Sequence, residues 1–242
     1  MPEHAIGEEV RAAVFDVFGT VVDWRTSVIA AGEELGREVG ATVDWAAFAD
    51  EWRRVGYLRQ IARIRRGEAP YETTDVFMLA SLRALLPTYG IAGASDGQVD
   101  RLHTVWHRLA PWPDSVEGLT RLRRRYRIAT LSNGNVELLT DMAAHAGLPW
   151  DAVLSAELVG RFKPDPLVYR SAGASLGLPL EQVVMVAAHL EDLYAAKAEG
   201  LRTAFVPRPQ EWGPDGWREG EPDGRVDIVA CDLVDLAAQL GA

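Results

Sequence analysis

The stretch AAVFDVFGTVVD, residues 12–23, decides the fold that we expect for this chain. It runs through four apolar residues into Asp16, then passes Gly19 and Thr20 and enters a second apolar run. A short apolar run that ends at turn residues is typical of a buried strand. A lone aspartate at such an end caps a turn more often than it reacts, so its role depends on the rest of the sequence.

The composition describes a folded, acidic protein. The chain has 242 residues, 48% of them hydrophobic, and a formal net charge of −10 at pH 7. This length can bury one core, or a core with a modest insertion. Because phosphate binding needs a basic face, the charge argues against a nucleic-acid partner, while a local cluster of cations could still bind a small anion.

Cysteine content and targeting signals indicate the compartment. One cysteine, Cys231, can form neither an internal disulfide nor a cysteine-rich zinc site. The N-terminal stretch MPEHAIGEEV is acidic and lacks the apolar core of a signal peptide. No run approaches the ~18 apolar residues of a membrane span. We therefore expect a cytoplasmic protein with no membrane partner.

The outer parts of the chain alternate short apolar runs with amphipathic stretches, which predicts an α/β fold with a parallel sheet covered by helices on both faces. The later strands are expected at RIATLS (127–132), AVLSAELV (152–159), VVMVAAH (183–189), TAFVPR (203–208) and DIVACDL (227–233). Helices are expected at NVELLTDMAAHAG (135–147), PLVYRSAGASLG (166–177) and DLYAAKAEG (192–200).

The middle of the chain has helical periodicity and almost no strand signal. We expect residues 24–108 to form a helical cap subdomain, inserted into a core made of residues 1–23 and 109–242. The stretch RPQEWGPDGWREGEPDGR (208–225) is interpreted as a long surface loop before the last strand.

Polar residues gather at the expected strand ends, where the ligands of open parallel sheets bind. They are Asp16, Ser132 with Asn133, Lys163 and Asp192. Taken singly, each is most often a turn residue, a helix cap or a solvated lysine. Together they place a carboxylate nucleophile, a hydroxyl donor, a cation and a second acid on one rim.

Four motifs carry a resemblance to the haloacid dehalogenase superfamily. They are D-x-x-G-T (16–20), L-S-N-G (131–134), K-P-D (163–165) and D-x-x-x-A-x-x-x-G (192–200), in that family's order. The ordered set with an inserted cap is far more specific than any one motif. The resemblance implies a Rossmann-like, doubly wound parallel sheet and a covalent nucleophile at Asp16.

Two positions separate this chain from the magnesium-dependent phosphatases of that superfamily. Phosphatases carry a second Asp two residues after the nucleophile, where this chain has Phe18, and an Asp four residues before the last motif, where it has Ala188. Mg²⁺ requires near-octahedral oxygen ligation, so a site lacking one carboxylate would bind it poorly. We therefore expect no metal and no cofactor, and a leaving group that needs no proton.

The closer resemblance is to the L-2-haloacid dehalogenases, in which an aromatic residue occupies the position of Phe18. It implies that Asp16 displaces a halide from a short anionic 2-haloacid and that water hydrolyses the resulting ester. Asp16, Lys163 and Asp192 are then catalytic. The residues implied to bind substrate or halide are Phe18, Thr20, Arg53, Ser132, Asn133 and Tyr169. Two of these have ordinary alternatives, a surface arginine for Arg53 and a core aromatic for Tyr169.

Typical members read S-S-N where this chain has Ala187, Ala188 and His189, so that their first serine is Ala187 here and their asparagine is His189. His189 stands three residues before Asp192, so a helix starting there would put both side chains on one face. An imidazole accepts a proton near neutral pH. We hypothesise that His189 works with Asp192 as a catalytic base; the alternative is that His189 fills the asparagine's space and donates one hydrogen bond.

Two other functions are compatible with these motifs. One is a phosphatase with a degenerate site, and the other is a non-catalytic member that binds a small anion. A homodimer is compatible with the same sequence.

Overall fold

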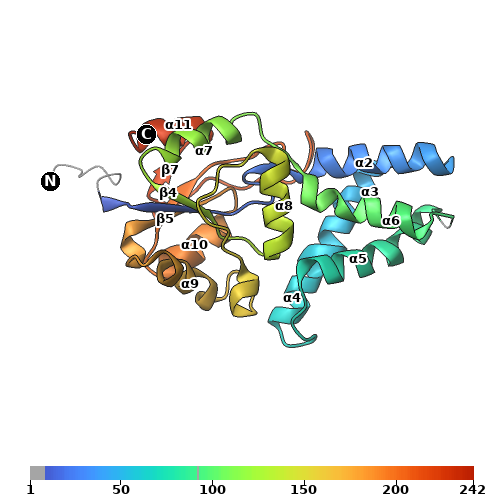
Figure 1. Cartoon of the computed structure of the whole chain (residues 1–242), viewed down its shortest axis with the longest axis horizontal. Coiled ribbons are helices and arrows are strands. Elements are labelled where there is room, and N and C mark those ends of the chain that lie inside the picture. Colours follow the sequence, from blue (N-terminus) through green and yellow to red (C-terminus); the bar gives the residue numbers. More distant parts are fainter. Residues whose placement is uncertain (1–8, 92) are drawn as a thin grey trace.

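The computed structural model describes residues 9–91 and 93–242. Residues 1–8 therefore lie outside the described residues. They include the start of the expected core and most of the acidic N-terminal stretch MPEHAIGEEV. Figure 1 shows an α/β core with a group of helices at one end of its sheet. Across the described residues, none of the helices has the length and apolar character needed to cross a bilayer.

The core is built on a five-stranded parallel sheet in the order β4-β1-β5-β6-β7. The strands are β1 (Ala12–Phe15), β4 (Arg127–Thr130), β5 (Val183–Ala187), β6 (Arg202–Phe205) and β7 (Ile228–Val229). Every residue of β1 and β5 is buried, as expected for strands covered on both faces. Counted within this sheet, the order is 2-1-3-4-5, so the strand order reverses at β1 and the ligand crevice is expected between the carboxyl ends of β1 and β5.

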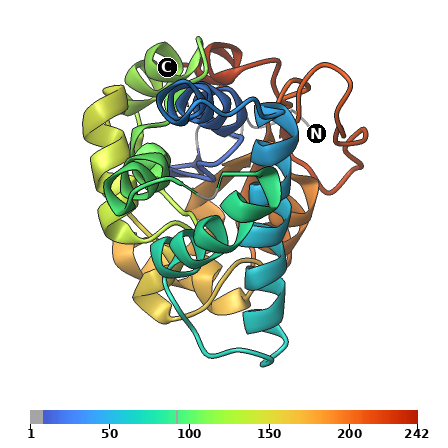
Figure 2. The ribbon, with the colours of Figure 1, turned by 90° about the vertical axis from the view of Figure 1, so that its right-hand side faces the viewer.

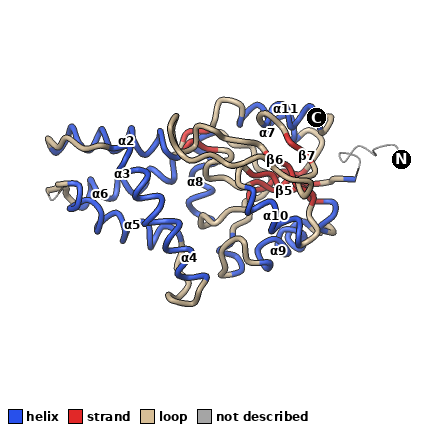
Figure 3. The backbone as a smooth tube through the Cα atoms, turned by 180° about the vertical axis from the view of Figure 1, so that it is seen from behind, coloured by secondary structure: helices blue, strands red, loops and turns tan. Residues whose placement is uncertain are grey.

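Helices cover both faces of the sheet, which confirms the expected doubly wound α/β fold. Figures 1 and 3 show α7 (Ser115–Arg123) and α11 (Leu233–Gln239) on one face and α9 (Pro166–Leu176) and α10 (Leu190–Ala198) on the other. The remaining core helix, α8 (Val136–Ala146), stands between the sheet and the helices at its end.

The helices at the end of the sheet are α2 (Trp24–Val39), α3 (Trp45–Glu51), α4 (Arg59–Arg65), α5 (Thr74–Leu85) and α6 (Asp96–His103). They all fall within residues 24–108, which we keep as the proposed cap. Viewed from that end, they lie in front of the core (Figure 2). The chain leaves and re-enters the core at one place, because β2 (Val22–Asp23) pairs antiparallel with β3 (Ala110–Pro111).

One long cap helix is wound unevenly. Between α3 and α4, residues Trp52–Leu58 form a π-helical segment, η1. A 3₁₀ turn, η3 (Thr104–Arg108), directly follows α6, and the ring centre of its Trp106 lies 5.5 Å from that of Trp52 in η1. Wide π-helical turns are often found at functional sites. The uneven segment carries Arg53 on its buried side.

The prediction of a strand at AVLSAELV (152–159) is wrong. Residues 152–159 form only isolated bridges with the β4 side, at Ala152 and Ser155, followed by a 3₁₀ turn, η4 (Ala156–Val159). The side chain of Thr130 takes the place of a ladder rung, because its Oγ1 accepts from the Leu154 N–H at 2.9 Å and donates to the Leu154 carbonyl at 2.8 Å.

The loop at 208–225 is irregular, as expected, but its start is anchored in the core. Arg208 makes two 2.7 Å hydrogen bonds to the carboxylate of Asp114 and a third, at 2.9 Å, to the carbonyl of Thr20. Glu211, three residues later, is only 4% exposed. The interpretation of this stretch as a surface loop is therefore wrong for its first residues, which this ion pair brings under the cap.

We predict that Arg208→Met lowers the free energy of unfolding by about 2 kcal/mol, because it leaves the Asp114 carboxylate partly buried and unpaired. The matched control is Arg225→Met, which removes an exposed ion pair with Asp223 from the same loop and should leave the urea midpoint unchanged. Equal midpoint shifts in the two variants, measured by urea unfolding, would contradict the anchoring role of Arg208.

Candidate active site

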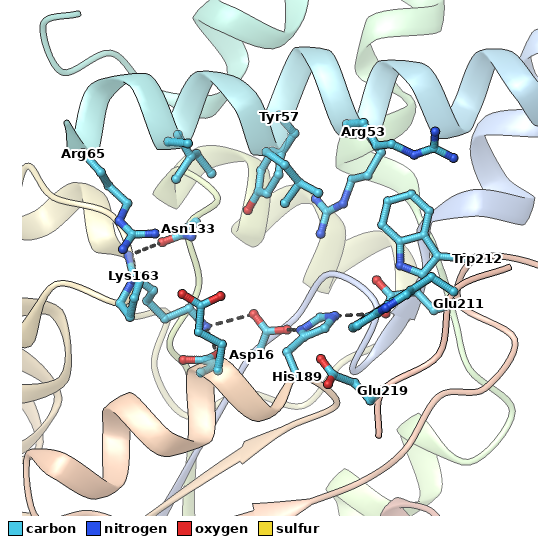
Figure 4. Close-up of a pocket in the computed structure, with 18 of the residues that line it drawn as sticks. Asp16, Arg53, Tyr57, Arg65, Asn133, Lys163, His189, Glu211, Trp212 and Glu219 are labelled. Atoms are coloured by element: carbon cyan, nitrogen blue, oxygen red, sulfur yellow. Dashed lines mark hydrogen bonds and ion pairs between the residues drawn. The ribbon is translucent and has the colours of Figure 1, made fainter. Parts of the chain in front are cut away.

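Asp16 lies at the carboxyl end of β1, in the crevice that the strand order predicts, and is 6% exposed. Its Oδ1 accepts from Lys163 Nζ at 2.9 Å, and its Oδ2 accepts from the Thr20 hydroxyl at 2.8 Å. His189 Nδ1 lies 3.2 Å from the same Oδ2 (Figure 4). Burial raises the pKa of Asp16, but the charges of Lys163 and His189 outweigh burial and hold that pKa well below its usual range. Asp16 is therefore an ionised, buried carboxylate.

Lys163 bridges two carboxylates. Its Nζ lies 2.9 Å from Asp16 Oδ1 and 2.5 Å from Asp192 Oδ2. The second oxygen of Asp192 accepts from the Tyr169 hydroxyl at 2.7 Å. Burial lowers the pKa of Lys163, but Asp16 and Asp192 outweigh it and raise that pKa, so the ammonium stays charged. The backbone N–H of Lys163 also donates to Asn133 Oδ1 at 2.8 Å.

The turn after Asp16 is shaped by two residues of the D-x-x-G-T motif. Thr20 donates to Asp16 and accepts from the Ala188 N–H at 2.9 Å, which joins the ends of β1 and β5. Gly19 has a φ of 86°, and a Cβ there would lie 2.1 Å from Glu211 Oε1. Only glycine leaves room for that carboxylate.

His189 forms an ion pair with Glu211. Its Nε2 lies 2.9 Å from Glu211 Oε2, while Glu211 Oε1 accepts from the Trp24 indole at 3.0 Å. Burial lowers the pKa of His189, but the charge of Glu211 and the hydrogen bond to Asp16 outweigh it and raise that pKa well above its ordinary value. Burial likewise raises the pKa of Glu211, and the charge of His189 outweighs that and lowers it. The resting site thus holds an imidazolium between two carboxylates.

The expected pairing of His189 with Asp192 is wrong. α10 begins at Leu190, and His189 precedes it in extended conformation with φ −116° and ψ 117°. Within the described parts of the chain, the hydrogen-bond partners of the His189 ring are Asp16 and Glu211, whereas Asp192 contacts Lys163 and Tyr169. No local pattern marks Glu211, which lies in irregular chain 22 residues after His189.

Arg53 is a buried cation in an aromatic cage. It is 4% exposed, and its guanidinium lies 4.0 Å from the ring centre of Tyr57, 5.4 Å from Trp24, 5.5 Å from Phe18 and 6.0 Å from Trp106. In the part of the chain that the structure describes, its Nε and Nη1 have no hydrogen-bond partner. A buried, unpaired charge is costly, so this guanidinium is suited to an anion that enters the site.

A cavity of about 650 Å³ separates the cap from the core. Arg53 and Tyr57 line it from the cap, and the core side includes Asp16, Lys163 and His189 (Figure 4). Asn133, Tyr169 and Asp192 also line it, whereas three expected substrate residues lie behind its wall: Phe18, Thr20 and Ser132.

Each of those three residues supports a residue that lines the cavity or the loop beside it. The Phe18 ring packs edge-on against Tyr57, Thr20 holds Asp16, and Ser132 Oγ accepts from the Gly134 N–H at 3.3 Å. These contacts shape the walls of the cavity from behind.

The donor set does not match a metal site. Among residues 9–91 and 93–242, no three or more His, Cys, Asp or Glu side chains are grouped so that they could hold a metal ion. The position at which the magnesium-dependent phosphatases carry their second carboxylate is Ala188, which is buried and has no donor side chain, while Asp16 and Asp192 share the Lys163 ammonium. The site therefore has a fixed positive charge beside Asp16 and lacks that carboxylate.

Several known proteins resemble this chain in sequence and fold. A family model described as haloacid dehalogenase-like hydrolase matches residues 10–200. An (S)-2-haloacid dehalogenase from Burkholderia cepacia is 30% identical over 204 residues, which cover 83% of this chain and 84% of that one. A solved L-2-haloacid dehalogenase is 45% identical with a TM-score of 0.90, covering 96% of this chain and 99% of the other. A solved defluorinating L-2-haloacid dehalogenase is 44% identical with a TM-score of 0.92, covering 96% of each chain.

We predict that the His189 imidazole stays protonated well above pH 6.5 and that Glu211→Gln lowers its pKa, because the substitution removes the carboxylate hydrogen-bonded to Nε2. The measurement is an NMR titration of the His189 ring protons. Glu219→Gln is the matched control, since Glu219 also lines the cavity but makes no hydrogen bond with His189. An equal or larger fall in the control would exclude Glu211 as the main partner.

Proposed function

The chain belongs to the haloacid dehalogenase-like hydrolase family, and we propose that it converts a short (S)-2-haloacid to the 2-hydroxy acid through an ester on Asp16, without a metal. Its named relatives, at up to 45% identity, make it a hydrolase of carbon–halide bonds. The observation that carries the finer proposal is the pairing of an ionised carboxylate, Asp16, with an unpaired guanidinium, Arg53, across one cavity.

In the first stage, Asp16 attacks carbon 2 of the haloacid. The carbon–halogen electron pair leaves with the halide, and a carbon–oxygen bond to the Asp16 carboxylate forms. Arg53 receives the departing halide, because its Nε and Nη1 are free donors inside an apolar cage. Asn133 and the backbone beside it hold the substrate carboxylate, so that attack is in line with the leaving group. A halide is a weak base and needs no proton, which suits a site with Phe18 where phosphatases carry an acid.

The first stage creates the conditions for the second. Once Asp16 is an ester it carries no charge, so His189 loses one of the two carboxylates that raise its pKa. The imidazolium then releases its proton to solvent, and the neutral ring accepts a proton from the water that attacks the Asp16 carboxyl carbon. Glu211 stabilises the imidazolium that forms. Hydrolysis frees the 2-hydroxy acid and restores the Asp16 carboxylate, and the overall reaction yields one halide and one proton.

Lys163 and Asp192 serve Asp16 in this mechanism. The ammonium lowers the pKa of Asp16 before the attack and stays in place through its contact with Asp192. Tyr169 donates to Asp192 and thereby orients it. We therefore assign the activation of water to His189 with Glu211, and the positioning of the lysine to Asp192.

The two rival functions have less support. A phosphatase would need the two further carboxylates whose positions are taken by Phe18 and Ala188 in this chain. A member that only binds anions would not need an ionised carboxylate facing the anion site, since that carboxylate repels an anion unless it reacts. We keep the cytoplasmic location and a homodimer as proposals that rest on the sequence.

We expect halide release from (S)-2-chloropropionate that is unchanged by EDTA, because Phe18 and Ala188 replace two carboxylates that the metal-dependent reaction requires. Asp16→Asn should lower kcat by about 10⁴-fold or more, since an amide is not a nucleophile. Asp100→Asn, an exposed cap substitution of the same type, is the control for the change of charge. Inhibition by EDTA that added Mg²⁺ reverses would reject the metal-free proposal.

We expect Glu211→Gln and His189→Asn each to keep the initial burst of halide while slowing steady turnover by about 10²-fold. The reason is that both residues act on ester hydrolysis, after the halide has left. Rapid-quench measurement of halide with substrate in excess separates the two stages. Loss of the burst together with the steady rate would mean that this pair serves the attack of Asp16 instead.

A further inference from the structure

The cap contacts the core at a second place, away from the β2–β3 pair. There the N-terminal end of α5 meets the loop that carries Asn133. Thr74 Oγ1 donates to the Asn133 carbonyl at 2.7 Å. Asn135 Nδ2 donates to Asp75 Oδ2 at 2.8 Å, and the Asp75 N–H donates back to Asn135 Oδ1 at 3.4 Å. Thr74 and Asn135 are buried. The contact is thus a closed polar joint between α5 and the loop at 133–135.

His107 links this joint to a core helix. Its Nε2 lies 3.1 Å from Asp75 Oδ1, and its Nδ1 lies 2.8 Å from Asp141 Oδ2. Asp75 belongs to α5 of the cap, and Asp141 belongs to α8 of the core. The side chain of His107 is 14% exposed. One imidazole therefore joins a cap carboxylate to a core carboxylate, and we call His107, Asp75 and Asp141 the latch.

The latch lies beside the catalytic cavity but does not line it. Asn133 connects the two, because its carbonyl accepts from Thr74 and its Oδ1 accepts from the Lys163 N–H. Arg53 reaches the cavity from the cap, while Asp16 and Lys163 reach it from the core. A substrate that contacts both Arg53 and Asp16 requires the cap and the core to be held in a fixed relative position.

We propose that His107 is a positioning residue, which in its charged form ties α5 to α8 and holds Arg53 of the cap over Asp16 of the core. The cap is connected to the core at two places, the β2–β3 pair and the latch. When the latch is made, the anion-binding guanidinium and the nucleophile are held at one separation. The kinetic test of this role rests on the proposed function, whereas the latch itself is a property of the fold.

The charges around His107 favour its protonated form. It faces Asp75 on α5, Asp141 on α8 and His103 on α6, whose ring centre is 6.4 Å away. The hydrogen bond to Asp75 raises the pKa of His107, and Asp141 adds to this against the effect of burial. Burial lowers the pKa of His103, whose Nε2 lies 3.1 Å from the Asp75 carbonyl oxygen and 3.9 Å from Asp75 Oδ1.

The direction of the pH effect follows from the raised pKa. The closed latch binds the proton more tightly than an opened one, so closure is favoured below the raised pKa of His107 and weakens as the pH rises through it. For the enzyme this means that kcat/KM falls on the alkaline side as the latch loses its charge. This fall of kcat/KM at high pH, the alkaline limb of the pH profile, should disappear when residue 107 has no titratable side chain.

The test compares wild type, His107→Gln and His145→Gln in halide release from (S)-2-chloropropionate between about pH 6 and about pH 10. His145 is an exposed histidine of α8, so its substitution controls for the loss of an imidazole. His107→Gln should raise KM about tenfold, the worth of one charge-assisted hydrogen bond, with kcat within about threefold of wild type. It should also lose the alkaline limb of kcat/KM that His145→Gln retains. An unchanged KM and an unchanged limb in His107→Gln overturn the proposal.

Asp141→Asn tests the same latch at an exposed carboxylate, where folding is not at risk. It should move the alkaline limb to lower pH without removing it, because Asp75 still faces His107. A limb that stays in place overturns the proposal.

Hydrogen exchange followed by mass spectrometry gives a readout without catalysis. At one pH, the amides of residues 133–136 should exchange faster in His107→Gln than in wild type. Equal exchange in the two proteins would overturn the proposed latch. A wild type that released no halide would contradict the proposed function instead, and the exchange measurement would still test the latch.

Discussion

The ammonium of Lys163 is the interaction on which the rest of the site depends. It lies between the carboxylates of Asp16 and Asp192, all three of them buried. Without that charge, burial would raise the pKa of Asp16 and leave it a poor nucleophile. Lys163 precedes α9 and Asp192 lies in α10, so one side chain fixes two helices against the end of β1.

Most of the charged groups around Asp16 form ion pairs with one another. Asp16 and Asp192 share Lys163, and Glu211 is matched by His189. Arg53 then stands without a hydrogen-bond partner for its Nε and Nη1 in the described part of the chain, in a cage of aromatic rings. Arg53 therefore offers a local cation to the anionic substrate that we propose, although carboxylates such as Glu191 and Glu219 also line the cavity.

Sequence reasoning succeeded where a side chain follows a buried strand and failed where tertiary contacts decide. The apolar run before Asp16 and the helix after Lys163 are local signals, and both elements are found as expected. The strand predicted at 152–159 does not form, because the side chain of Thr130 hydrogen-bonds the backbone of Leu154. Hydrophobic periodicity does not reveal such a contact. Glu211 was missed for a similar reason, since its burial depends on the distant pair of Arg208 and Asp114 rather than on its neighbours in sequence.

His189, Glu211 and Gly19 have to be understood as one unit. A histidine placed beside Asp16 without Glu211 would have one carboxylate for a partner, and in the mechanism that we propose Asp16 loses its charge once the ester forms. In that mechanism, Glu211 keeps its charge beside His189 Nε2 through both stages. Its carboxylate lies where the Cβ of residue 19 would be, so the motif glycine makes room for it as well as for the turn. In a relative that has asparagine at the position of His189, replacing that asparagine with histidine would therefore not by itself reproduce the ion pair to which we assign the activation of water. The partner, Glu211, and the space that Gly19 leaves for it come from two other segments of the chain.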